Sequence, residues 1–495
     1  MSPRLFAAGG GALVSVLLGA CAVGPNYQAP AVPTPAAFAA PGEFESAAPL
    51  LRWWQVLGDD NLTALIERAV GGANLDLRSA DARIRQARAE LAVAAAASVP
   101  SLNASAQVSR DRFSRESELF ANLPFPNPQL QFTDYRAGFD ASWEIDLFGH
   151  ISRNVEAADA RLQGAQAGWQ DARIAVAGEV ARTYIQLRQG EEQFSLGEAD
   201  LTALTQSARL VQLRFEAGNE SALDLRRARA EVQTQSATLD EIRAEKAASL
   251  DALAVLVGVT PEEVQGLILP DRPVPVPGAD RIAVGLPSDL LRRRPDVRRA
   301  ERDLAAATAD IGVATADLYP RFQLVGNFGV DTIRPGELGQ QASRTWSLAP
   351  QFYLPLIGRG RLKSAVNARE AARDAALSAY QKSVLSALSD VEMAMVRFDR
   401  ARARLAALEQ AMLDLEGNAA LVREQYAAGR SSSIDVLAAE RQARQMHEQV
   451  TDAKANLDIQ LVALYKALGG GWSATGPDAP APGADAQQMS SQTAR

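Results

Sequence analysis

Four kinds of residue are scarce in this chain of 495 residues, and each scarcity argues against a class of protein. With two histidines and one cysteine, the chain has too few ligands for a typical zinc site and no second cysteine for a disulfide. Aromatic residues make up only 6%, and much of the 47% hydrophobic content is alanine, which favours long helices packed side by side over a thick globular core. Basic residues are outnumbered, and the net charge of -8 disfavours a nucleic-acid-binding protein.

Long apolar runs are also missing. The one run, at residues 1–20, is too short for a spanning helix, so any further membrane crossing must use strands. It carries one basic residue, Arg4, and ends in Leu-Gly-Ala before Cys21, as a secretory signal peptide does. A cysteine there resembles the bacterial lipobox, in which that cysteine is diacylated, and Ala22 in place of an Asp indicates the outer membrane. A plain signal peptide with a chance cysteine is the alternative.

What is present is an internal repeat. A helical stretch, a proline and an alternating segment recur around Pro100 and Pro320, and a Gly-containing turn followed by serine recurs at Gly218 and Gly429. In each copy the pattern predicts a long helix, a strand pair, a second long helix, a tight turn and a third helix. The predicted organisation is a signal peptide at 1–20, a lipidated segment at 21–58, repeat 1 at 59–268, a Pro-rich connector at 269–287, repeat 2 at 288–468 and a flexible tail at 469–495.

Four segments alternate apolar and polar residues, which is typical of strands with one apolar and one polar face. The second carries Arg136, Asp140 and Glu144 on its polar face, which suits a water-filled lumen. Four strands leave two open edges that are not viable in lipid, so several copies must share one barrel, and a conduit favours three copies over two. Four half-buried strands of a soluble sheet are the alternative. The predicted strands are 101–111, 135–147, 321–331 and 345–356.

Long helices account for most of the remaining sequence. Apolar residues in the second half alternate spacings of four and three from Val384 to Tyr426, which indicates coiled-coil packing. Each long helix stops at a glycine, Gly218 or Gly429, that can adopt a positive φ. The sequence predicts helices at 152–215 and 362–426, helices returning from the turns at 225–256 and 436–468, and helices leading into the strands at 62–97 and 289–317.

Segments 21–27, 53–54, 143–149 and Leu291–Glu301, together with the two glycine turns, resemble the TolC-like outer-membrane factors. The lipidated N-terminus resembles that of their NodT-type lipoprotein branch. The resemblance implies a mostly α protein with a membrane β-barrel: a homotrimer with a 12-strand barrel, four strands per protomer, continued by an α-helical coiled-coil periplasmic tunnel. It implies a passive exit duct of a tripartite efflux pump, working with a periplasmic adaptor protein and an inner-membrane transporter of the resistance-nodulation-division class.

The resemblance also implies a gate at the periplasmic tips. In family members, acidic residues after the second tip form rings at a constriction, and the first such position matches Asp435. The second position falls on Ala438, and an arginine that holds some members shut falls on Ser431, so this sequence departs from the pattern twice. Asp224 is the matching residue of the first tip, and Glu440 is a substitute for the missing acid. The alternative is that Asp435 only favours the start of its helix.

The two tips, 215–225 and 426–436, are where the resemblance places adaptor docking, at Phe215, Gly218, Ser221, Tyr426, Gly429 and Ser432. An enzyme is disfavoured, since the sequence shows no Ser-His-Asp order, metal-ligand cluster or Gly-rich phosphate loop. We expect no metal and no cofactor apart from the lipid on Cys21. A structural or adhesive coiled-coil lipoprotein without a pore is the alternative function, and the exported substrate stays open among drugs, solvents, metals and signalling molecules.

Overall fold

The computed structural model describes residues 22–39, 44–45, 51–114, 130–269, 273–275 and 282–470. The predicted signal peptide, Cys21 and most of the predicted tail lie outside the described residues. The chain divides into two compact units, and each unit draws on both sequence repeats, so repeats and units do not coincide. Unit 1 comprises Met1–Pro30, Arg85–Gly164 and Ala300–Ala379, and unit 2 comprises Ala31–Ile84, Ala165–Arg299 and Tyr380–Arg495.

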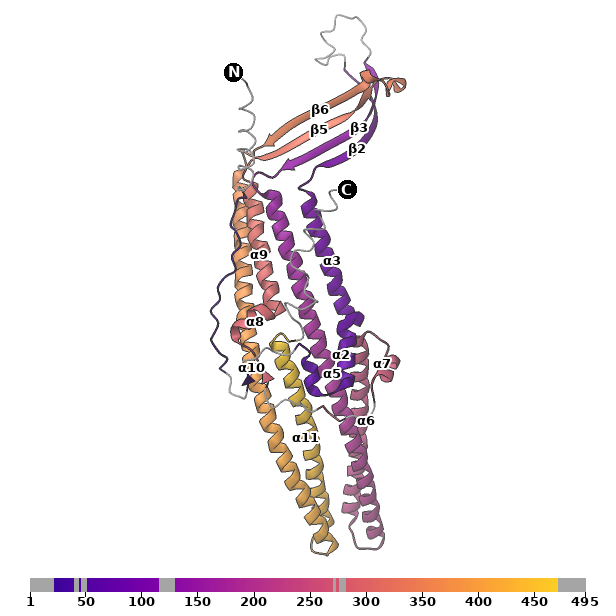
Figure 1. Cartoon of the computed structure of the whole chain (residues 1–495). Helices are drawn as coiled ribbons and strands as arrows, with labels where there is room; N and C mark the ends of the chain where they lie inside the picture. The colour runs from indigo at the N-terminus through magenta and orange to yellow at the C-terminus, as the bar shows by residue number, and fades with distance from the viewer. Residues whose placement is uncertain are drawn as a thin grey trace, which may run out of the picture. The chain divides into compact units, whose positions relative to one another are not determined.

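A four-stranded antiparallel sheet is the main feature of unit 1 (Figure 1). The strand order is β2-β3-β5-β6, so the hairpins from the two halves of the chain pair through β3 and β5. The predicted bounds need two corrections. The second strand along the chain spans 131–145 instead of 135–147, with Gln131 paired to Arg112, and the last strand ends at Tyr353 instead of residue 356. The bounds are β2 Ser101–Arg112, β3 Gln131–Ile145, β5 Arg321–Thr332 and β6 Arg344–Tyr353.

The two faces of this sheet differ in chemistry, as the alternation predicts. Phe139 pairs with Phe328, which in turn pairs with Trp346, and all three side chains are exposed on one face. One step along the strands, the opposite face carries a row of polar residues, because successive side chains point to opposite sides. That row runs across the sheet through Asn103, Asp140, Asn327 and Ser347.

The long helices occur as predicted, while two shorter ones are interrupted. The helix expected at 62–97 breaks at Gly72, whose φ of 108° is outside the helical range. The helix expected at 289–317 breaks at Arg294, because a residue before proline disfavours helical backbone. No described helix has the length and apolar composition needed to cross a membrane. The helices are η1 Trp53–Leu57, α2 Asp60–Arg68, η2 Ala69–Ala73, α3 Leu75–Ala96, α5 His150–Glu216, α6 Ala222–Val257, α7 Pro261–Leu267, α8 Pro287–Arg293, α9 Pro295–Ala316, η3 Pro335–Glu337, η4 Gln341–Ser343, α10 Arg359–Ala427 and α11 Ser433–Ala467.

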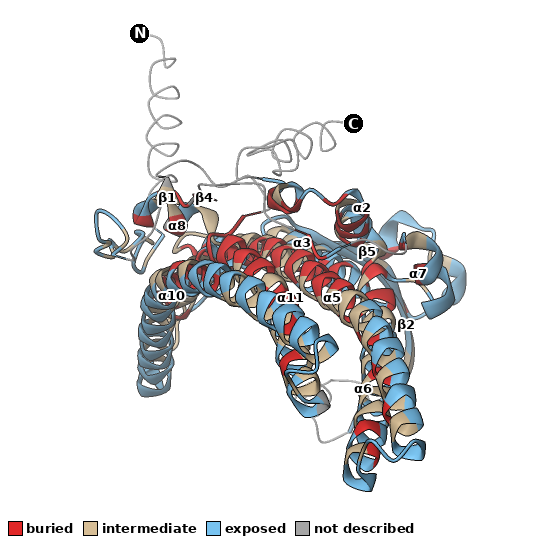
Figure 2. Ribbon diagram, turned by 90° about the horizontal axis from the view of Figure 1, so that it is seen from below, coloured by how far each residue is buried: buried red, intermediate tan, exposed pale blue. Residues whose placement is uncertain are grey.

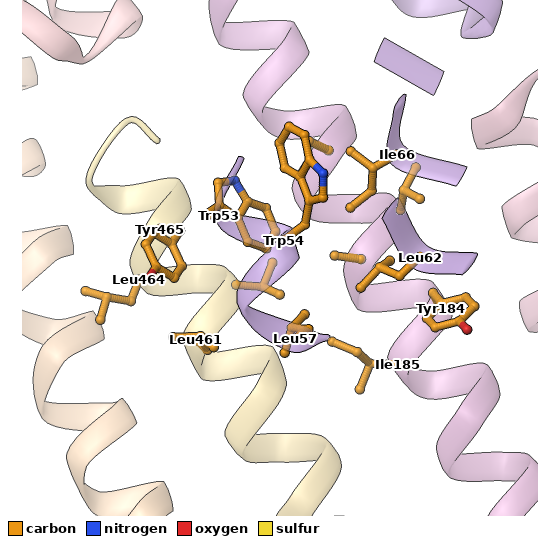
Figure 3. Close-up of a cluster of buried hydrophobic side chains, with 14 of the residues drawn as sticks. Trp53, Trp54, Leu57, Leu62, Ile66, Tyr184, Ile185, Leu461, Leu464 and Tyr465 are labelled. Atoms are coloured by element: carbon orange, nitrogen blue, oxygen red, sulfur yellow. The ribbon is translucent and has the colours of Figure 1, made fainter. Parts of the chain in front are cut away.

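The largest hydrophobic core lies in unit 2 and is built around two tryptophans of η1. Trp53 stacks on Tyr465 of α11 with ring centroids 5.6 Å apart, and Trp54 lies edge-on to Trp53 (Figure 3). Within this unit, buried residues gather on α5 and α11, while the tip ends of α6, α10 and α11 are mostly exposed (Figure 2). The Pro-rich connector adds a two-residue strand, β4 Ile282–Ala283, that pairs in parallel with β1 Phe44–Glu45.

A buried polar network ties the connector to this core. Arg188 of α5 is 0% exposed and donates to the hydroxyl of Tyr184 at 2.9 Å and to the carbonyl of Leu269 at 2.7 Å. The Tyr184 hydroxyl in turn donates to Asp59, which caps α2 through the backbone N–H of Asn61. Because each buried group has a partner, the network holds α2, α5 and the connector in one arrangement.

Candidate functional site: the helical tips

Both helical hairpins of unit 2 turn with the same backbone geometry. Gly218 has a φ of 78° and Gly429 a φ of 72°, which confirms the positive φ predicted for both. At the first tip the N–H of Asn219 donates to the carbonyl of Arg214 at 2.8 Å, and the N–H of Gly218 to that of Phe215 at 2.9 Å. The second tip repeats both bonds at the equivalent positions. These are the bonds of a Schellman motif, which satisfies the carbonyls at the end of a helix.

The second tip leads into α11 through a reciprocal cap. The Ser432 hydroxyl accepts from the N–H of Asp435 at 3.2 Å, and the Asp435 carboxylate accepts from the N–H of Ser432 at 3.0 Å. The hydroxyls of Ser432 and Ser431 also donate to this carboxylate, at 2.7 and 3.1 Å. The bonds from Ser432, then that from Ser431, lower the pKa of Asp435, which is exposed and carries its charge at neutral pH.

The first tip uses the same residues less completely. The Ser221 hydroxyl accepts from the N–H of Asp224 at 3.2 Å, so Asp224 also lies in the first turn of its helix. Among the described contacts the Asp224 carboxylate accepts from the Ser221 hydroxyl but not from the Ser221 N–H, whereas the second tip has a complete capping box. Both acidic residues therefore lie in the first turn of a helix, and for Asp435 this is the role that the sequence analysis holds as the alternative to a gate.

Two contacts join the hairpins close to their tips. The Arg214 guanidinium of α5 lies 4.8 Å from the ring centroid of Tyr426 in α10. Arg441 of α11 pairs with Glu231 of α6 at 3.4 Å. Neither pairing is predictable from the sequence, since the partners lie more than two hundred positions apart, although Arg214 and Tyr426 each precede a tip glycine by a few residues.

A partly open cavity of about 300 Å³ lies between the hairpins. Ala438, where the family pattern has its second acid, contributes to the lining, as does Asp224. The substitute acid Glu440 is instead paired with Arg423 of α10 at 3.0 Å and so braces the second hairpin. The lining combines the apolar residues Val211, Ile434, Leu437 and Ala438 with the charged residues Asp224, Arg227, Glu231 and Arg441.

In unit 1, the residues that follow Cys21 are held against the start of α5. The N–H of Val23 donates to the carbonyl of Phe148 at 3.1 Å, and the buried Arg153 donates to the carbonyl of Val23 at 3.3 Å and to the side chain of Asn26 at 2.6 Å. Gly24, at a φ of 90°, leaves no room for a side chain against the backbone of Gly312. The N-terminal segment is thus seated beside the junction where β3 gives way to α5.

Comparison with known proteins places the chain in a family. The outer membrane efflux protein family matches residues 69–259 and 286–470, which is more than half of the chain, so the chain belongs to this family. The two matched regions fall on the two sequence repeats. The predicted family and function are thereby confirmed: the chain is an outer-membrane efflux protein, and the reading as a scaffold without a pore is not supported.

Relatives and solved structures agree with this assignment along nearly the whole chain. Outer membrane protein OprJ of Pseudomonas aeruginosa is 31% identical over 93% of this chain and 95% of its own length. Nodulation protein T of Rhizobium leguminosarum bv. trifolii is 29% identical over 93% and 96%. The outer-membrane channel OprN has a TM-score of 0.83 at 32% identity, covering 91% of this chain and 100% of the other. The predicted fold class is therefore confirmed.

Proposed function

We propose that three copies of the chain form the exit duct of a tripartite efflux pump. The observation that carries this proposal is the four-stranded sheet, which has an exposed apolar face, a polar opposite face, and unpaired edges at β2 and β6. In lipid every backbone polar group needs a partner, and strand pairing between three copies supplies it with twelve strands. The polar rows then line the lumen. The exported substrate passes through the duct unchanged, so the proposed duct needs neither enzyme activity nor a cofactor.

The remaining parts of the proposal concern anchoring and partners. Acylation of Cys21 adds a lipid anchor next to the segment that Arg153 seats on the start of α5. A periplasmic adaptor docks on the tips, where Phe215, Leu223 and Ile434 expose apolar surface. The adaptor joins the duct to an inner-membrane transporter of the resistance-nodulation-division class.

The gate of this duct is assigned to a ring of three Asp435 side chains. Hydrogen bonds from two serines keep each carboxylate ionised, so the ring attracts cations and repels anions at a narrow pore. Asp224, which lines the cavity between the hairpins, contributes less to the gate than Asp435 does. Glu440 forms an ion pair with Arg423.

The test separates the charge of Asp435 from its role at the helix start. Asp435→Asn keeps an oxygen that can accept from the N–H of Ser432 but removes the charge, whereas Ser432→Ala removes the hydroxyl that accepts from the backbone N–H of Asp435 but keeps the charge. In planar bilayers we expect Asp435→Asn to raise conductance and weaken cation selectivity, and Ser432→Ala to resemble the wild type. If Ser432→Ala reproduced the effect of Asp435→Asn, helix capping would explain both and the gate assignment would fall.

A further inference from the structure

A carboxyl group in the core of unit 2 has no partner. Asp458 of α11 is 0% exposed, and neither carboxyl oxygen makes a hydrogen bond within the described part of the chain. The neighbouring residues Leu457 and Leu461 belong to the hydrophobic core. Buried polar groups in native proteins almost always have partners, so this exception requires a physical explanation.

The same core can satisfy a carboxylate elsewhere. Asp59 is 6% exposed, yet it accepts from the backbone N–H groups of Asn61 and Leu62 at 2.8 and 2.9 Å and from the Tyr184 hydroxyl at 2.8 Å. Asp59 thus lies in a built polar site, while Asp458 is a fully buried titratable group with no hydrogen-bond donor among the described residues. The difference lies in local surroundings, not in the overall polarity of the core.

Burial alone determines how tightly Asp458 holds its proton. Removal from water disfavours the ionised form and raises the pKa of this carboxyl from 3.8 to about 8. Burial is the cause of that shift. The charged or titratable groups on the elements of this core include Glu179, Arg182, Tyr184, Arg188 and Glu191 in α5, Asp251 in α6, Glu392, Arg397, Asp399, Arg400, Arg402 and Arg404 in α10, Asp59 before α2, and Lys454, Tyr465 and Lys466 in α11.

We propose that Asp458 makes the packing of α11 on the core of unit 2 a proton-linked equilibrium. The neutral carboxyl stays inside the core. When its proton passes to solvent, the carboxylate can be hydrated only if this part of α11 leaves the core, because burying an unpaired charge costs several kcal/mol. α11 begins at the second tip, so its release also loosens the helix that carries Asp435; this last consequence rests on the proposed gated duct.

The direction and steepness of the effect follow from the two proton affinities. A carboxyl that binds its proton more tightly when buried favours the packed helix in acid and loses that contribution as the pH rises. The release equilibrium constant therefore rises about tenfold per pH unit between about pH 4 and pH 8 and levels off above about pH 8. Acid tightens α11 on the core, and neutral to alkaline solution loosens it.

Hydrogen exchange on the full chain, purified in detergent, tests the proposal. Asp458→Asn is an uncharged variant of the same shape, so comparing its protection with that of the wild type at each pH cancels the intrinsic pH dependence of exchange. For amides around Asp458, we expect the ratio of variant to wild-type protection to rise about a hundredfold between about pH 5.5 and 7.5. The control Asp452→Asn removes an exposed carboxylate of α11 and retains the wild-type profile.

A ratio that does not change with pH would overturn the proposal. Asp458→Leu provides a second uncharged variant should the asparagine variant fold poorly, and it is expected to give the same pH-independent protection. Exchange in α11 is independent of conduction, so a failure of the Asp435 gate in bilayers would leave this result standing. Conversely, a pH-independent α11 with a working Asp435 gate would reject this inference and retain the proposed function.

Discussion

At the scale of single residues, this protein shows two opposite ways of burying an ionisable side chain. Arg188 is fully buried but satisfied, through Tyr184, Leu269 and an ion pair with Glu191 at 2.5 Å. Asp458 is fully buried and unsatisfied. The first arrangement fixes a single geometry, because every departure exposes unpaired groups, whereas the second makes the packed state depend on a proton.

We expect Arg188→Met to lower the free energy of unfolding by about 3–5 kcal/mol, because the methionine leaves Glu191 and the Leu269 carbonyl without their partner. The matched control is Arg182→Met on the same helix, whose side chain is 40% exposed in its pair with Glu179. An exposed pair contributes at most about 1 kcal/mol. Thermal unfolding of both purified variants measures the difference, and equal shifts would argue against the network.

At the scale of elements, the tips and the helix breaks show how far local sequence signals reach. The turn glycines and the Ser–Asp helix starts were predictable because both the cause and the effect lie within six residues of one another. The breaks at Gly72 and Arg294 also had local signals, a glycine pair and a following proline, but the helical periodicity on both sides outweighed them in the sequence interpretation.

Other features had no local signal at all. Arg214 and Tyr426 meet only because the two hairpins are neighbours in the fold, and the same holds for Arg441 and Glu231. The burial of Asp458 has no signal in its sequence context, where Asn456 and Gln460 flank Leu457, Asp458 and Ile459. The strand pairing of β1 with β4 involves two residues on each side, which is too short for a pattern.

The second tip offers a test in which two glycine substitutions act in opposite directions. Gly429→Ala places a side chain at a φ of 72°, with no contact within 4 Å, so only backbone strain of about 1–2 kcal/mol opposes it. Gly417→Ala lies inside α10, also in open space, and stabilises the helix by about 0.5–1 kcal/mol. Thermal unfolding and protease sensitivity at the tip report both changes. Shifts of the same sign would contradict the assigned turn.

At the scale of the whole molecule, the unpaired edges of β2 and β6 and the exposed Phe139, Phe328 and Trp346 describe a protomer that is incomplete by itself. Backbone groups at such edges need partners in lipid, and apolar side chains on an exposed face need an apolar environment. Both needs are met when copies of the chain assemble in the outer membrane.

Expression of the full chain, including residues 1–20, tests assembly and anchoring together. We expect wild type and Cys21→Ser to form trimers in the outer-membrane fraction, because twelve paired strands hold the protein there without the lipid. Mass spectrometry should find acyl chains on the wild type alone. Soluble monomers of both proteins in the periplasm would show that the strands do not form a barrel, and the proposed duct would fail with them.

The division of each compact unit between the two halves of the chain has a consequence for biogenesis. The pairing of β3 with β5 joins Tyr135 to Thr332. The first hairpin can therefore form this pairing only after nearly two hundred further residues have been exported. During vectorial synthesis and export, the leading half therefore remains an aggregation-prone intermediate with an unpaired apolar strand. We therefore expect the yield of folded protein to depend more strongly on periplasmic holding chaperones when the second half of the chain is exported more slowly.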